Sequence, residues 1–101
     1  MPRGYWIAHF DVTGADAYKA YVAANAVPFA KYGARVLVRG GRCEVPEGAS
    51  RTRQVVIEFK DYETALACYR SPEYEAAKAL RVAASHADIV IVEGYDGPQP
   101  G

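Results

Sequence analysis

Four short hydrophobic runs along the chain have the length and composition that are typical of β-strands. They are residues 4–12, 34–39, 53–59 and 87–95. Because successive side chains of a strand point to opposite faces, Ile7 and His9 must share one face of the first stretch, while Trp6 and Phe10 share the other. Each stretch also carries an ionisable residue whose face is fixed by this alternation: His9, Arg39, Glu58 and Glu93. A face that carries such residues and is covered by another layer is a candidate site.

Two longer segments have helical periodicity instead. In the first, at about residues 15–32, bulky side chains recur at spacings of three and four, Pro28 predicts a bend, and Gly33 is a typical helix end. In the second, Asp61 can cap a helix, and Ser71-Pro72 is a second start signal that combines a capping serine with proline at the first helical position. The second segment is therefore predicted to be two helices, of which the latter ends near residue 85.

The resulting order, β-α-β-β-α-β, predicts an α+β protein with the ferredoxin-like fold. Right-handed crossovers place the helices on one face of a four-stranded antiparallel sheet and leave the other face bare. The second and fourth strands are apolar on both faces, which requires cover on both sides. We therefore expect a homodimer whose sheets pack together, built from one domain at residues 1–97 with a flexible tail at 98–101.

Composition narrows the classes of partner. The 101 residues contain 12 Lys and Arg against 12 Asp and Glu, so no net charge favours nucleic acid or an anionic membrane. No apolar stretch reaches the ~20 residues of a membrane span. Cys43 and Cys68 lie far apart, which indicates free thiols in a reducing cytoplasm. With two histidines and no clustered acids, we expect no metal site, and nothing in the sequence implies a cofactor.

Three of the ionisable residues are candidates for one site. If the more polar faces of the strands coincide, His9, Arg39 and Glu58 lie on one surface, where His9 can act as acid or base and Arg39 can bind an anionic group. The alternative is structural: His9 as a hydrogen-bonded barrel residue or dimer contact, and Glu58 as half of an ion pair. Tyr21 and Asn25, one helical turn apart on the face toward the sheet, are candidates to line a pocket.

Two further features have a structural interpretation. The paired Gly40 and Gly41 after the second strand predict a β-bulge or a sharp bend there. They do not form a phosphate loop, because the G-x-G-x-x-G pattern and a following helix are both missing. Arg81, near the end of the last helix, is interpreted as a charge at the rim of the protein.

Several short motifs carry a resemblance to a known family. They are GYWIAH at 4–9, FAKYG at 29–33, VRGG at 38–41, VIEF at 56–59, YRSPEY at 69–74 and VEGY at 92–95. Together they resemble the domain-of-unknown-function 1330 family of the dimeric α/β-barrel superfamily, over residues 4–97. The resemblance implies the ferredoxin-like fold and a dimer whose two sheets form a barrel. The superfamily includes cofactor-independent monooxygenases, isomerases and haem-degrading enzymes.

Two functions follow as hypotheses. In the first, the chain is a small-molecule-binding dimer, and as an enzyme it catalyses proton transfer or oxidation without a cofactor. His9 and Glu58 would be catalytic, Arg39 would hold an anionic ligand, and Tyr21 and Asn25 would line the pocket. In the second, the chain is a non-catalytic structural or regulatory dimer whose polar groups serve packing. A concave pocket with several of these side chains distinguishes the first from the second.

Overall fold

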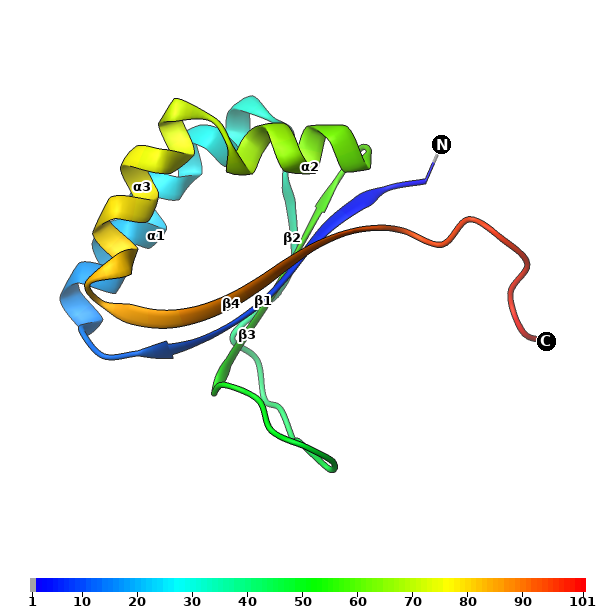
Figure 1. The fold of residues 1–101 in the computed structure, drawn as a ribbon, viewed down its shortest axis with the longest axis horizontal. Helices are drawn as coiled ribbons and strands as arrows, with labels where there is room; N and C mark the ends of the chain where they lie inside the picture. Colours follow the sequence, from blue (N-terminus) through cyan, green and yellow to red (C-terminus); the bar gives the residue numbers. More distant parts are fainter. Residues whose placement is uncertain (1) are drawn as a thin grey trace.

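A computed structural model describes residues 2–101 and shows a four-stranded sheet covered by helices on one face (Figure 1). The elements follow the order β1 (Gly4–Val12), α1 (Ala15–Lys31), β2 (Arg35–Arg39), β3 (Arg53–Phe59), α2 (Tyr62–Tyr69), α3 (Pro72–Val82) and β4 (Ser85–Glu93). The sheet order is β2-β3-β1-β4, and all neighbouring pairs are antiparallel. The predicted ferredoxin-like topology is therefore confirmed.

Most of the helices begin and end at the capping residues and the glycine that the sequence analysis identified. The Asp61 carboxylate accepts a hydrogen bond from the Thr64 N–H at 2.8 Å, and the Ser71 hydroxyl accepts one from the Tyr74 N–H at 3.1 Å. These two caps separate α2 from α3. Gly33, just beyond α1, has a φ of 68°, which an L side chain would adopt only with strain. At the other end of the chain, β4 begins two residues earlier than predicted and ends at Glu93.

The core lies between the sheet and the helices and is dominated by aromatic rings. Trp6 of β1 packs against Phe29, Phe59, Tyr69 and Tyr74 with centroid separations of 5.0–5.6 Å. Its indole Nε1–H also donates to the Ala65 carbonyl at 2.9 Å, which fixes β1 to α2. The inward face predicted from strand alternation, with Trp6 and Phe10, is thus the buried one.

The bulge in β2 does not lie at the paired glycines. The pairing with β3 shifts register between Val36 and Val38, so Leu37 is the extra residue. Val36 pairs with Ile57 before the shift, and Arg39 pairs with Val55 after it. Because Val55 and Ile57 lie on the helix-covered face, the shift turns Arg39 to that face.

The opposite face of the sheet is open in the chain and carries several apolar side chains. Ile7 is 48% exposed, Val90 57%, and Val38 and Val92 39% each. Ile7 lies between Val56 of β3 and Val90 of β4 in the strand register, so these side chains form one patch, here called the open-face patch. Within residues 2–101, no helix is both long and apolar enough to cross a membrane.

The two cysteines should differ in reactivity. Cys43 is exposed, whereas Cys68 is fully buried in α2, and burial raises the pKa of its thiol to about 12. We expect one thiol per chain to react with a disulfide reagent such as DTNB at neutral pH, and the second only after denaturation. In a Cys43→Ser variant the native protein should show no fast reaction. Rapid labelling of that variant would show that the core around α2 opens readily.

Candidate functional site

A cavity lies between the sheet and the helices. It has a volume of about 30 Å³ and is bordered mainly by aromatic and branched aliphatic side chains. Its lining residues are Trp6, Ala8, Phe10, Tyr18, Tyr21, Val22, Asn25, Phe29, Val36, Arg39, Arg53, Val55, Ile57, Tyr74 and Ile89. Three of the five predicted site residues, Tyr21, Asn25 and Arg39, are among them.

Two phenols form the most buried polar pair of this cavity. The Tyr21 and Tyr74 hydroxyl oxygens are 2.8 Å apart, and these residues are 4% and 0% exposed. Burial is the main cause that raises the pKa of both phenols above their ordinary value. Both therefore stay protonated at neutral pH. Since one proton joins the two oxygens, the other is available to donate to a neighbour such as Asn25 or a bound ligand.

Two guanidinium groups line the cavity and no carboxylate does. Arg39 is exposed at its edge, while the Arg53 Nε is buried and has no hydrogen-bond partner within the described residues. The Arg53 guanidinium carbon lies 5.5 Å from the centroid of the Tyr18 ring. The cavity is therefore electropositive on the side of β2 and β3.

Arg81 is a functional candidate that the sequence analysis placed wrongly. It is only 5% exposed, so it is not a rim charge. Its guanidinium lies 5.8 Å from the Phe10 ring and 5.7 Å from the Tyr21 ring, and its Nε has no partner among residues 2–101. The signal was present in the sequence, because Arg81 lies on the same helical stripe as the buried Tyr74 and Ala77.

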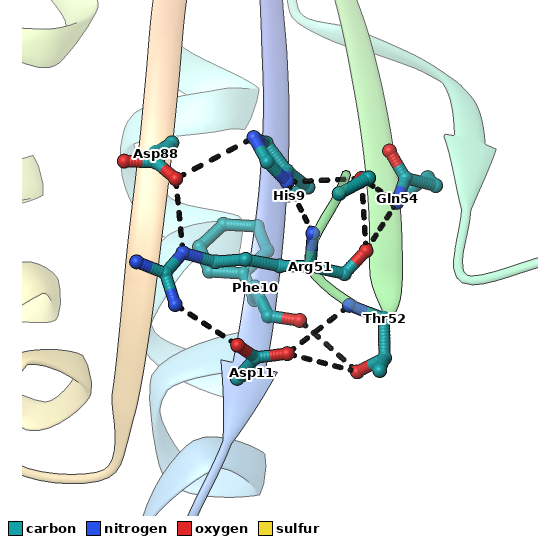
Figure 2. Close-up of polar contacts among 8 residues, drawn as sticks. His9, Phe10, Asp11, Arg51, Thr52, Gln54 and Asp88 are labelled. Carbon is teal, nitrogen blue, oxygen red and sulfur yellow. Dashed lines mark hydrogen bonds and ion pairs between the residues drawn. The ribbon is translucent and has the colours of Figure 1, made fainter. Parts of the chain in front are cut away.

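His9 belongs to a different group, on the open face of the sheet (Figure 2). Its Nδ1 accepts a hydrogen bond from the Arg51 backbone N–H at 2.7 Å and lies 3.1 Å from the Ser50 hydroxyl. Its Nε2 is 3.6 Å from the Asp88 carboxylate, which β4 places directly opposite. Every polar atom of the imidazole thus has a neighbour within the chain.

Arg51 holds this group together. Its Nη1 donates to Asp11 at 2.9 Å and its Nε donates to Asp88 at 2.9 Å, so the side chain crosses β1 (Figure 2). The Thr52 N–H also donates to Asp11 at 3.1 Å. We call His9, Asp11, Arg51, Thr52 and Asp88 the Arg51 clamp, because these residues fasten the segment before β3 to the sheet. The sequence analysis missed Asp11, Arg51 and Asp88, although Asp11 shares a strand face with His9.

Glu58 lies on the same open face but far from His9. It accepts a hydrogen bond from the Tyr5 hydroxyl at 3.2 Å. Since β1 pairs Tyr5 with Glu58 and His9 with Gln54, the two residues are four positions apart, about 13 Å along the strand. His9 and Glu58 thus share a face as predicted but lie apart on it, and the predicted shared surface is wrong for Arg39. The β2 bulge turns Arg39 to the helix side, and the register separates the other two.

The described part of the chain, residues 2–101, holds no group of three or more His, Cys, Asp or Glu side chains arranged for a metal ion. The cavity residues offer hydrogen-bond donors and aromatic faces. Such a set can bind and orient an organic ligand and can stabilise an oxyanion.

Comparisons with known proteins identify a family and its fold. The model of a family described as "domain of unknown function (DUF1330)" matches residues 3–95. No curated protein matches the chain significantly.

Two solved structures show the same fold. A protein of unknown function from Rhodopseudomonas palustris is similar at 18% identity, with a TM-score of 0.76, over 95% of this chain and 85% of that one. SnoaB, a cofactor-independent oxygenase from Streptomyces nogalater, is similar at 13% identity, with a TM-score of 0.65, over 99% and 97% of the two chains. At these identities the likeness shows the shared α+β fold and nothing of the reaction.

The Arg51 clamp should make stability sensitive to acid. The Thr52 N–H, and then Arg51, hold the pKa of the Asp11 carboxyl below its ordinary value of 3.8. A carboxyl whose pKa is lower in the folded state than in the unfolded state stabilises the folded protein. This stabilisation is complete at pH values above the pKa of the unfolded state, and it is lost as the pH falls through the pKa of the folded state. Asp11→Asn should therefore lower the free energy of unfolding at neutral pH and flatten its decline in acid. Urea unfolding at several pH values measures both effects.

Asp96→Asn, in the exposed C-terminal segment, is the control, and an equal change in the stability of that variant would contradict the role assigned to Asp11.

Proposed function

The chain belongs to the DUF1330 family. On this premise we propose that it binds a small organic molecule at the cavity between its sheet and helices, which widens to admit the ligand. The observation that carries the proposal is the convergence of Tyr21, Asn25 and Arg39 on one aromatic-walled space. Polar groups from two separate elements at an apolar cavity are typical of ligand sites. The roles of these three residues in binding are part of the proposal.

The chemistry of the cavity suits a ligand with an oxygen acceptor. The protonated Tyr21–Tyr74 pair can donate to a carbonyl or to an oxyanion, and Arg81 beside the pair adds positive charge. Stabilisation of an enolate or a phenolate is what proton transfer or cofactor-independent oxidation of an organic substrate requires. We propose this class of reaction for the cavity. The fold shared with the oxygenase SnoaB is compatible with it.

His9 and Glu58 are separate from this cavity, and their catalytic roles stay predictions of the sequence. Because His9 is held by three groups of the chain, its geometry supports the second candidate function, in which the open face serves assembly. We propose that the open-face patch packs against a second copy of the chain, and that the dimer acts in the cytoplasm. Exposed apolar side chains on a bare sheet and two unpaired cysteines support these assignments.

Ligand binding can be tested by filling the cavity. Val22 lines it, whereas Val27 on the same helix is 63% exposed. We expect 1-naphthol, titrated by calorimetry, to bind the wild type and Val27→Phe but to bind Val22→Phe at least tenfold more weakly. Overpacking should cost Val22→Phe about 1–3 kcal/mol of stability, so circular dichroism must confirm that it is folded. Equal binding of 1-naphthol to both variants would contradict the proposed site. So would a wild type that binds neither 1-naphthol nor any similar small aromatic molecule.

Dimerisation can be tested at the open-face patch. Val90 is 57% exposed and lies next to Ile7 in the patch, on the edge strand β4, and Val27 lies on a helix surface. In sedimentation equilibrium we expect the wild type and Val27→Arg to have the mass of two chains and Val90→Arg that of one, because an unpaired charge in an apolar interface is costly. A monomeric wild type at high concentration would show that the patch has another use.

A further inference from the structure

An open groove lies next to the cavity and shares lining residues with it. The groove has a volume of about 410 Å³ and is lined by Val12, Ala15, Tyr18, Lys19, Val22 and Arg53. Three of these residues, Tyr18, Val22 and Arg53, also line the cavity. The two spaces therefore share the part of their lining that these three residues form.

A stacked pair forms much of this shared lining. The Arg53 guanidinium lies over the Tyr18 ring at 5.5 Å, and the backbone of Gly40 lies close to the guanidinium on another side. A Cβ added at Gly40 would overlap Arg53 Nη1, and the φ of +63° there also favours glycine. Gly40 thus makes room for Arg53 in its present position. A flexible arginine held by stacking alone can turn aside far more easily than a strand or helix can move.

The charges around both spaces point to the kind of ligand. Neither lining includes an Asp or Glu, while Arg39, Arg53 and Lys19 border the spaces and Arg81 lies behind the phenol pair. Among residues 2–101, no carboxylate forms an ion pair with Arg39, Arg53 or Arg81. The Nε atoms of Arg53 and of the 95%-buried Arg81 have no partner in this part of the chain. A guanidinium Nε that loses water without gaining a hydrogen-bond partner is costly to bury, and a bound anion can supply that partner.

We propose that the cavity and the groove are one binding site for a flat aromatic carboxylate, with Arg53 as both the gate and the partner of the carboxylate. The inference rests on the proposed function of the cavity and adds the ligand class and the entry route. When Arg53 turns from Tyr18, the ring of the ligand takes its place among Trp6, Phe10 and Tyr18, and the carboxylate accepts from the guanidinium fork. The cavity alone is much smaller than the roughly 300–1,000 Å³ of known ligand sites, and the groove brings the joined space into that range.

A pair of matched probes tests the ligand class. 2-Naphthoate and 2-naphthamide have nearly the same shape and differ in charge, and Trp6 is the one tryptophan of the chain and lies in the cavity wall. We expect naphthoate to quench Trp6 fluorescence and to bind the wild type at least tenfold more tightly than the amide. Arg53→Met should remove this preference, whereas Arg70→Met, at an exposed site outside both spaces, should keep it.

Gly40→Ala provides a second variant in which the charge of Arg53 is kept. Because the added Cβ displaces the guanidinium, we expect the preference for naphthoate to fall in this variant as well. Circular dichroism checks that each variant is folded.

The outcomes separate this inference from the proposed function. If both probes bind the wild type equally, or if neither binds while 1-naphthol does, the cavity binds ligands but the anionic class is wrong. If naphthoate, naphthamide and 1-naphthol all fail to bind, the proposed function itself is wrong. If Arg53→Met keeps the preference for naphthoate, Arg53 is not the partner of the carboxylate.

Discussion

The helices cover a single face of the sheet, and side-chain alternation along the strands decides on which face each polar group of the sheet lies. Trp6 and Phe10 of β1 point toward the helices, and their neighbours Ile7 and His9 point away from them. A single extra residue in β2 then reverses the face to which the following residues of that strand, Val38 and Arg39, point. Leu37 is that residue, and it is the reason that a guanidinium from an edge strand borders the cavity instead of the open face.

A buried cation, Arg81, makes the helix-covered face unusual for a core. The Arg81 guanidinium lies close to the Phe10 and Tyr21 rings, and no carboxylate of residues 2–101 forms an ion pair with it. Aromatic faces offset part of the cost of burying a guanidinium, but they supply no hydrogen-bond acceptor for its Nε. A core selected for stability alone is better served by an apolar residue of similar volume at this position. The proposed function gives this charge a use, because Arg81 lies beside the phenol pair that lines the cavity.

The sequence predicts the fold of this chain much better than it predicts its site. Caps such as Asp61 and Ser71 act within three residues, so the helix starts can be found from local patterns. The face on which Arg39 lies could not be predicted from local patterns, because the bulge at Leu37 involves no glycine and depends on pairing with β3. Arg51 was missed for a similar reason: its partners are 37 and 40 residues away, and only the folded sheet brings them together.

The two faces of β1 connect assembly with binding. Ile7 lies in the open-face patch, and Trp6, its neighbour in the chain, forms part of the cavity wall and hydrogen-bonds to α2. A strand held by hydrogen bonds on both sides moves as a unit, so a displacement of Ile7 also displaces Trp6. The Arg51 clamp fastens the far end of the same strand to β4 and to the segment before β3. A partner on the open face would therefore contact the same strand whose other side chains line the cavity.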